Sequence, residues 1–547
     1  VNTASGNYGF VGGGKSNVSS GTVSSISGGN ANTASGDYSS IGGGSGNSTL
    51  SFGFVGGGSG NTASNGSAIS GGSSNCIHAS SPNGFIGGGR SNTISGNYKC
   101  YGVIGGGQCN QVLNPFSSVV GGFSNCAVGC YSVVGGGNNN LACGLNSFVG
   151  GGQQNRATNR WTSVLGSNNI ASNTGAFIGG GAQNTSNAIY SSVVGGVYNT
   201  SSGCYSIVGG GRLNTSSGCY SSLLGGCNNC ATGIFSAVVG GCGNKAIGTY
   251  SGVVGGFSNC AVGSNSFVAF GCNNVSCGSD SGILSGYKNL ICNNAYGSNT
   301  ISSGYCNTIG QYASYSFLGG GGINGISGYS NSSVLVGGTA NTVSGTNSFV
   351  GTGYVNNVSI SCSNIVGGRN NQVSNAYSTI SGGYGNTVSS LYSIIGGGKG
   401  NRACGNYSIV GGGQSNQATN GWSSVLGGCN NCATGVFSSV LGGCGNLTTG
   451  YGSFVGGGIN NYMSANCSVI GGGLNNADYT GSTLNVIVGG QGNTIYNTGP
   501  YGSKYRNTIG GGAGNTISGG YDNTIAGGRY NATGDRAGAI GGGGNNN

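Results

Sequence analysis

Pairs of adjacent apolar residues recur along the chain at a nearly constant interval, separated by glycine-rich and polar segments. Residues 147–157 read S-F-V-G-G-G-Q-Q-N-R-A, and the same order of apolar pair, glycine run, asparagine and small apolar residue returns in most units. Similar pairs occur at Val133-Val134, Phe148-Val149, Val164-Leu165, Phe177-Ile178, Val193-Val194, Ile207-Val208 and Leu223-Leu224. The pattern predicts two strands of about four or five residues per unit, joined by tight turns of Gly and Asn.

The asparagine marks the period most clearly. It returns every 15 residues from Asn184 to Asn289 and again from Asn341 to Asn476, so 547 residues hold about 36 units. We expect these side chains to form a structural ladder: Asn184, Asn199, Asn214, Asn229, Asn244, Asn259, Asn274, Asn289, Asn341, Asn356, Asn371, Asn386, Asn401, Asn416, Asn431, Asn446, Asn461 and Asn476.

Fifteen residues are too few for a helical repeat, which needs about 33, or for a propeller blade, which needs about 40. The period instead predicts an all-β parallel β-solenoid, a two-sided β-roll with about 15 residues per coil. Residues 1–547 would form a single continuous domain of about 36 coils, stacked ~4.8 Å apart into a rod on the order of 170 Å long. The spacing is irregular near 76–110, 290–340 and 477–547.

Half-period steps near the end of the chain indicate that the coil has two equivalent sides. Asn507, Asn515, Asn523 and Asn531 follow one another at intervals of eight residues. Either side of a coil should therefore accept the same strand sequence.

Alternation along a strand predicts which residues face the core. We expect the apolar residue two places after each asparagine to point inward, as at Ala157, Ala231, Val373 and Ala403. Adjacent strand residues point to opposite faces, so one member of each apolar pair should point outward along the whole solenoid. The columns in question hold Val149, Val194, Val208 and Val254, or their neighbours one place earlier. Unless a bend turns both members inward, this apolar face predicts a cyclic homo-oligomer.

Composition removes most catalytic chemistry. The chain holds 129 Gly, five Asp, one His and no Glu, so neither helical surfaces nor paired carboxylates are expected. The net charge of +10 comes from scattered residues such as Lys15, Arg90 and Lys245, which argues against nucleic-acid binding. No apolar run approaches the ~20 residues of a membrane span. We therefore predict no enzyme activity, no cofactor and no membrane insertion. The chain opens in mid-pattern at Val1, and we expect it to be a piece of a longer protein.

The 22 cysteines fall in the columns of the repeat. Four pairs lie 15 residues apart and would stack within disulfide reach: Cys204 with Cys219, Cys227 with Cys242, Cys277 with Cys292, and Cys429 with Cys444. The alternative is that cysteine is a small apolar substitute for Ala, Val or Ser. The two C-x-x-C pairs, at residues 227–230 and 429–432, lie too far apart to complete one zinc site, so no metal site is predicted. His78 is interpreted as a solvated turn residue.

The unit S-x-V-V-G-G-G-x-x-N-x-A-x-G resembles the head repeat of YadA-like trimeric autotransporter adhesins over nearly the entire chain. The resemblance implies a left-handed parallel β-roll and three chains packed by apolar faces about a threefold axis. Similar repeats occur in phage and giant-virus fibre proteins. The 15-residue spacing, the heavier glycine runs and the absence of a following stalk or membrane anchor depart from the adhesin pattern. The many cysteines favour a virion fibre or another extracellular filament.

Together these patterns predict a structural and adhesive extracellular fibre, a rigid homotrimeric rod on a cell or virion surface. Its Ser, Asn and Thr faces would meet host-surface glycans or proteins. An ice-binding solenoid and a polysaccharide-degrading β-helix enzyme remain the alternatives. Intermittent threonines weaken the former, and the scarcity of acids and bases weakens the latter.

Overall fold

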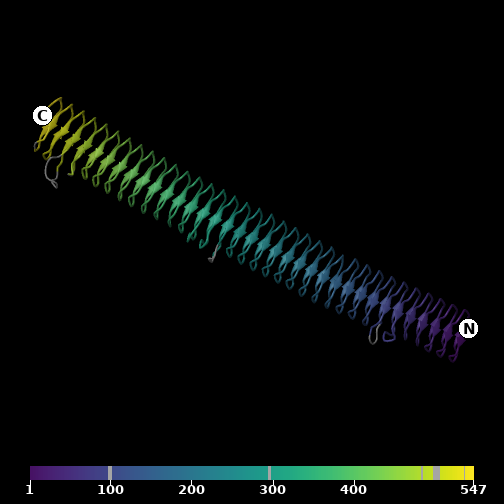
Figure 1. Cartoon of the computed structure of the whole chain (residues 1–547). Helices are drawn as coiled ribbons and strands as arrows, with labels where there is room; N and C mark the ends of the chain where they lie inside the picture. Colours follow the sequence, from purple (N-terminus) through teal and green to yellow (C-terminus); the bar gives the residue numbers. More distant parts are fainter. Residues whose placement is uncertain (97–100, 293–296, 482–483, 497–504, 535) are drawn as a thin grey trace. The chain divides into compact units, whose positions relative to one another are not determined.

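The computed structural model describes residues 1–96, 101–292, 297–481, 484–496, 505–534 and 536–547. Within these ranges the chain forms 70 strands of two residues each and no helix (Figure 1). It divides into two compact units, unit 1 (Val1–Gly271) and unit 2 (Cys272–Asn547). Unit 1 contains β1 (Thr3–Ala4) to β36 (Phe267–Val268), and unit 2 contains β37 (Val275–Ser276) to β70 (Ala539–Ile540).

Each unit is a parallel β-solenoid with two strands per coil. Odd-numbered strands stack into one sheet, here called sheet A, and even-numbered strands stack into a second, sheet B. The described residues make eighteen coils in unit 1 and seventeen in unit 2, close to the predicted total. The prediction of an all-β solenoid with about 15 residues per coil is confirmed.

One coil shows how the sequence is used. β20 (Phe148–Val149) lies in sheet B and β21 (Arg156–Ala157) in sheet A. Each strand pairs in register with its counterpart in the next coil, so that Val149 stacks on Val164 and Ala157 on Ala171. The predicted strand length of four or five residues is wrong. The chain leaves the extended conformation on both sides of β20, with φ of 54° at Asn146 and 88° at Gly152.

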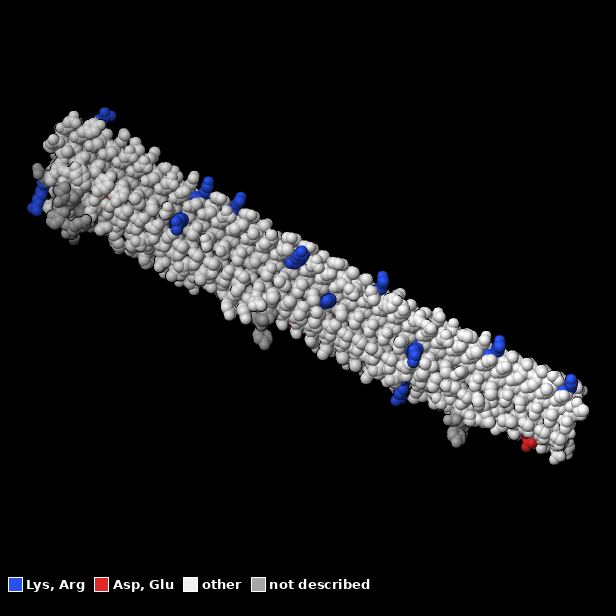
Figure 2. Space-filling view, in the orientation of Figure 1, with Lys and Arg blue, Asp and Glu red and all other residues white. Residues whose placement is uncertain are grey.

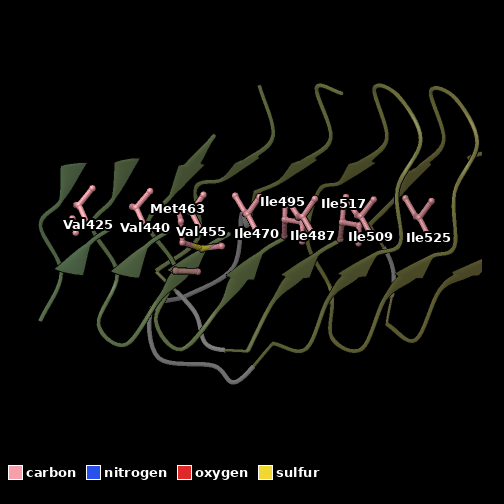
Figure 3. Close-up of a cluster of buried hydrophobic side chains, with 12 residues drawn as sticks. Val425, Val440, Val455, Met463, Ile470, Ile487, Ile495, Ile509, Ile517 and Ile525 are labelled. Atoms are coloured by element: carbon pink, nitrogen blue, oxygen red, sulfur yellow. The ribbon is translucent and has the colours of Figure 1, made fainter. Parts of the chain in front are cut away.

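The core consists of one inward side chain from each strand. Ala157, Ala231, Val373 and Ala403 are fully buried, which confirms the predicted register. Sheet B contributes mainly Val, Ile and Leu, whereas sheet A contributes smaller Ala, Ser and Val side chains through most of its length. In unit 2 the inward residues near the C-terminal end, including Val425, Met463 and Ile525, form a continuous column (Figure 3).

The predicted asparagine ladder is confirmed, and it is buried rather than exposed. The Asn401 side chain shows its bonding. Its Oδ1 accepts the backbone N–H of Asn416 at 2.9 Å, and its Nδ2 donates to the carbonyl oxygens of Gly397 at 2.8 Å and Gly413 at 3.0 Å. Each ladder asparagine therefore forms hydrogen bonds both within its own turn and with the next coil. Full hydrogen bonding allows so many amides to lie inside the solenoid at low cost.

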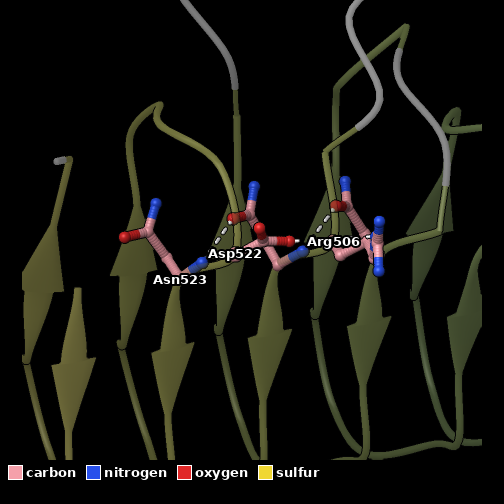
Figure 4. A network of polar contacts seen from close by, with 5 residues as sticks. Arg506, Asp522 and Asn523 are labelled. Carbon is pink, nitrogen blue, oxygen red and sulfur yellow. Dashed lines mark hydrogen bonds and ion pairs between the residues drawn. The ribbon is translucent and has the colours of Figure 1, made fainter. Parts of the chain in front are cut away.

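Near the C-terminus the same ladder occurs on both sides of the coil. Asn531 donates its backbone N–H to Asn515 Oδ1 beside sheet A, and Asn523 donates to Asn507 Oδ1 beside sheet B (Figure 4). The eight-residue steps of the sequence are half-coils, as predicted. A surface ion pair between Arg506 Nε and Asp522 Oδ1, 3.9 Å apart, lies next to this second ladder.

The two connections between the strands of a coil differ in how much their length varies along the chain. From the start of a sheet B strand to the start of the next sheet A strand the spacing within each unit is eight residues, except seven between β22 (Ser163–Val164) and β23 (Ile170–Ala171). We call these the glycine turns. The opposite connections, here called variable turns, span from six to fourteen residues. Where the spacing is irregular the strands stay in register, with Thr494 beside Thr516. Insertions are therefore confined to one edge of the coil.

Close packing of backbones fixes the length and composition of the glycine turns. Gly226 has φ +91°, and a Cβ there would overlap both the Gly241 carbonyl oxygen and Asn229 Nδ2. The preceding Gly225 faces open space, with no atom within 4 Å of a Cβ placed on it.

Replacing Gly226 with alanine should therefore lower the free energy of unfolding of unit 1 by about 2–4 kcal/mol, from positive-φ strain and backbone overlap. Gly225→Ala is the matched control and should change stability by less than about 1 kcal/mol. Chemical denaturation followed by circular dichroism measures both. Equal losses in the two variants would contradict the assigned turn geometry.

Candidate functional site

The outward face of sheet B is apolar in most coils and carries no charged residue in any described coil. Two positions form it in each coil, the first residue of the strand and the residue directly after the strand, which flank the buried residue. Phe148, Ile207 and Leu224 are examples, and Leu224 leaves 57 % of its surface exposed. A face that is uncharged in every described coil and apolar in most of them has the character of an interaction surface, because soluble monomers rarely expose large contiguous apolar patches.

The sequence analysis placed this apolar face in one column, and that detail is wrong. Val149 and Val208 fill the core while their preceding neighbours Phe148 and Ile207 point outward. Val194 itself points outward, because Val193 is the buried member of that pair. One residue of each pair is inside and one outside, so no bend turns both inward.

The two outward positions compensate for each other in size. In most coils where the strand begins with a large residue, as at Phe148, a glycine follows the strand; where it begins with Ser192 or Ser222, a valine or leucine follows. A Cβ on Gly150 would lie 3.2 Å from Cε1 of Phe148 and 3.1 Å from Cδ2 of Leu165. The large side chain thus covers its small neighbour, and most coils present one bulky apolar group on this face.

The outward face of sheet A is mostly polar. Thr185, Thr200 and Thr215 occupy it in three successive coils, followed by Cys230 and Lys245. Arg156 and Arg402 occupy the same column elsewhere. The threonine rows are therefore short and interrupted by charged or sulfur-bearing residues. Lys and Arg are isolated on the visible face of the molecule (Figure 2).

Stacked aromatic rings line parts of the variable turns. Their residues have φ between about 50° and 60°, an unusual conformation for aromatic residues, and each ring lies over the equivalent ring of the next coil. In unit 1 the longest run comprises Tyr190, Tyr205, Tyr220, Phe235 and Tyr250, with ring centroids 4.9–5.4 Å apart. In unit 2 it comprises Tyr377, Tyr392, Tyr407, Trp422 and Phe437, with centroids 4.8–5.0 Å apart. We call these runs the aromatic ladders. Composition alone did not reveal them; the 15-residue spacing of Tyr, Trp and Phe was the available signal.

Of the four predicted cysteine pairs, one is a disulfide. Cys429 and Cys444 are joined across adjacent coils of unit 2, with Cα atoms 4.7 Å apart. The other six residues are thiols: Cys204, Cys219, Cys227, Cys242, Cys277 and Cys292. Burial and then the nearby Cys292 raise the pKa of Cys277, which keeps it protonated near neutral pH. Among described residues, no group of three or more His, Cys, Asp or Glu side chains could hold a metal ion. His78 is exposed in a turn, as predicted.

One acid occupies the core, which the sequence analysis missed. Asp478 lies in the inward column of sheet A beside Met463 and Ile495. Its Oδ1 accepts hydrogen bonds from the Thr480 hydroxyl at 2.7 Å and backbone N–H at 3.0 Å, and its Oδ2 accepts from Asn485 Nδ2 at 3.0 Å. Burial raises the pKa of Asp478 to about 6, although these hydrogen bonds act in the opposite direction.

Since the folded pKa of Asp478 exceeds its ordinary value of 3.8, the folded state binds this proton more tightly than the unfolded state. The stability of unit 2 should rise as pH falls from 7 through 6 towards 4, by at most about 3 kcal/mol from this group. Asp478→Asn should remove that pH dependence whatever its effect at pH 7. Denaturation midpoints measured from pH 4 to 7 test this; an unchanged slope in the variant would assign the dependence to another group.

No family model matches the chain, and no curated protein matches its sequence. No helix that could cross a membrane is found in the described part of the chain.

Proposed function

We propose that this chain is a structural and adhesive extracellular fibre protein that assembles as a parallel homotrimer of left-handed β-rolls. In this proposal the sheet B faces of three chains pack together about a common axis. The sheet A faces and variable turns then form the outer surface, which contacts glycans or proteins of a host. The fibre would belong to a virion or cell surface.

The outward face of sheet B is the observation that carries the proposal. It repeats one bulky apolar group in most coils and no charge, so a partner that covers it must repeat with the same step. Another copy of the chain meets that requirement, since equivalent coils then lie at the same height. Cyclic symmetry buries the face on every subunit without leaving one exposed.

The location of the insertions supports the adhesive part of the proposal. Extra residues occur only in the variable turns, while the glycine turns keep the eight-residue strand spacing apart from the one seven-residue case. In solenoid proteins, insertions on one face often mark the binding face. The polar outward side chains of sheet A, such as Thr200 and Thr215, offer hydroxyl groups for hydrogen bonding with sugars.

Solution mass tests the assembly. Light scattering should give three times the chain mass of 52.8 kDa at micromolar concentration. A stable monomer would remove the basis for the fibre proposal, and a dimer would replace the trimer by a two-chain arrangement.

Binding of the assembled protein to an array of host-type glycans and to cultured cell surfaces tests adhesion separately. The proposal expects saturable binding that is lost when the longer variable turns are shortened to the usual seven-residue strand spacing. A trimer that binds neither would be a purely structural filament.

A further inference from the structure

The aromatic ladders place tyrosines of adjacent coils in a geometry that favours a specific covalent reaction. In unit 1 the rings of Tyr190, Tyr205 and Tyr220 stack with centroids 5.4 and 5.1 Å apart and interplanar angles of 19° and 2°. In unit 2, Tyr377, Tyr392 and Tyr407 stack with centroids 4.8 and 4.9 Å apart and angles of 7° and 5°. These six residues form two tyrosine triplets.

The rings are accessible as well as close. Tyr205 leaves 50 % of its surface exposed, and every other member of the two triplets is exposed too. Neighbouring rings cover the ring faces, so each tyrosine offers mainly its edge to solvent. An edge carries the hydroxyl group and the two Cε carbons beside it.

We propose that the two triplets are sites of oxidative dityrosine cross-linking between adjacent coils of one chain. The reaction requires a one-electron oxidant, such as a peroxidase with hydrogen peroxide or a photogenerated metal oxidant. The product would join neighbouring coils covalently at the variable-turn edge, away from the Cys429–Cys444 disulfide.

The reaction balances as follows in terms of atoms and electrons. Each of two tyrosines loses one electron to the oxidant and its phenolic proton to water, giving two tyrosyl radicals. Their unpaired electrons reside partly on Cε, and a Cε–Cε bond forms between the rings. Each ring regains aromaticity when its Cε hydrogen moves to the phenolic oxygen. The chain has lost two hydrogens for each cross-link.

The solenoid favours this pairing over competing ones. A Cε–Cε bond holds the two Cγ atoms somewhat farther apart than the ~4.8 Å spacing of stacked strands, so the side chains must turn out of the face-to-face stack while the coils need to move apart only slightly. Because the solenoid holds the two stacked rings next to each other, each tyrosyl radical meets its neighbour at a much higher effective concentration than a tyrosine on another molecule. Tyr8 and Tyr198 are exposed but have no stacked aromatic neighbour among described residues, so they serve as internal references.

The neighbours of the triplets predict a difference between them. Tyr220 stacks on Phe235, which is hard to oxidise, whereas Tyr407 stacks on Trp422, which competes for the oxidising equivalent. The unit 1 triplet should therefore give the higher yield of dityrosine, and Trp422→Phe should raise the yield in unit 2.

The test uses the full chain as it assembles, with tris(bipyridyl)ruthenium, persulfate and brief illumination as the oxidant. Peptide mapping by mass spectrometry should find cross-links, each two hydrogens lighter than the sum of its peptides, at 190–205, 205–220, 377–392 and 392–407. The yield at each should exceed that involving Tyr8 or Tyr198 at least tenfold. A mixture of nitrogen-15-labelled and unlabelled chains identifies cross-links between chains by their mixed mass.

Tyr205→Phe and Tyr392→Phe are the decisive variants, because each keeps the stacked ring and removes the hydroxyl of the central residue. Cross-links at Tyr190 and Tyr220 should be lost in Tyr205→Phe, with those of unit 2 unchanged, and the reverse should hold for Tyr392→Phe. Persistent cross-linking of Tyr190 in Tyr205→Phe, a majority of mixed-mass products, or equal yields at Tyr8 would overturn the proposal. These outcomes do not depend on whether the chain is a trimer or adhesive.

Discussion

Asn356→Ala should lower the free energy of unfolding of its part of unit 2 by about 3–6 kcal/mol. The side chain donates to the carbonyl oxygens of Thr352 and Gly368 and accepts the backbone N–H of Asn371. Alanine leaves these three groups without a partner, and each costs about 1–3 kcal/mol where water cannot reach it. Denaturant titration, together with hydrogen exchange of the amides around residues 349–373, measures the loss and its location.

The adjacent residue provides the control. Asn357, the first residue of β47 (Asn357–Val358), has the same side chain as Asn356 but points outward. Asn357→Ala should change stability by less than about 1 kcal/mol. Comparable effects of the two substitutions would show that the buried ladder contributes little and that strand pairing alone holds the coils together.

Replacing Leu224 and Val239 with lysine should disperse the proposed trimer into single chains. The two residues point outward from successive sheet B strands, β30 (Ser222–Leu223) and β32 (Ala237–Val238). In a trimer they would place six lysines in an apolar interface, and burying unpaired charge is costly. We expect at least a hundredfold weaker association, which corresponds to about 3 kcal/mol. Mass photometry across a dilution series measures it.

The matched control places two lysines on the opposite sheet of the same unit. Thr200→Lys with Thr215→Lys alters the outward column of sheet A, where Lys245 already occurs. This variant should keep the mass of the unmodified protein. If the variant with lysines on sheet B still forms trimers, the outward face of sheet B is not the interface between the chains.

The regular part of the fold was predictable because the asparagines, the apolar pairs and the small apolar residues recur with the same period of about 15 residues. The asparagine spacing gave the coil length, and the small residues at Ala157 and Ala231 gave the inward register, since a thin core has room for few atoms. Strand length was not predictable from alternation. The positive φ at Asn146 and Gly152, on the two sides of β20, leaves only a short extended segment between them, and neighbouring coils supply the hydrogen bonds that make this backbone stable.

The candidate surfaces were only partly predictable. The apolar pairs showed that one residue must point outward, but which one depends on whether the pair consists of the two strand residues or of the second strand residue and the residue after the strand. Val149 and Val194 illustrate the two cases. Asp478 could not be assigned to the core from sequence, because its partners Thr480 and Asn485 lie in a turn of irregular length. The aromatic ladders required knowing that the turn residues of successive coils stack.

The nearly constant length of the glycine turns has a consequence for how such a gene can change. Because every coil offers its neighbours the same backbone register, removing or copying a segment of 15 residues joins two surfaces that already fit. The identical segments at 225–233 and 427–435 are what such copying leaves behind. Recombination between misaligned copies would then alter the number of coils while leaving each remaining contact unchanged. Length is in this sense an adjustable trait, open to selection independently of the stability of any one coil.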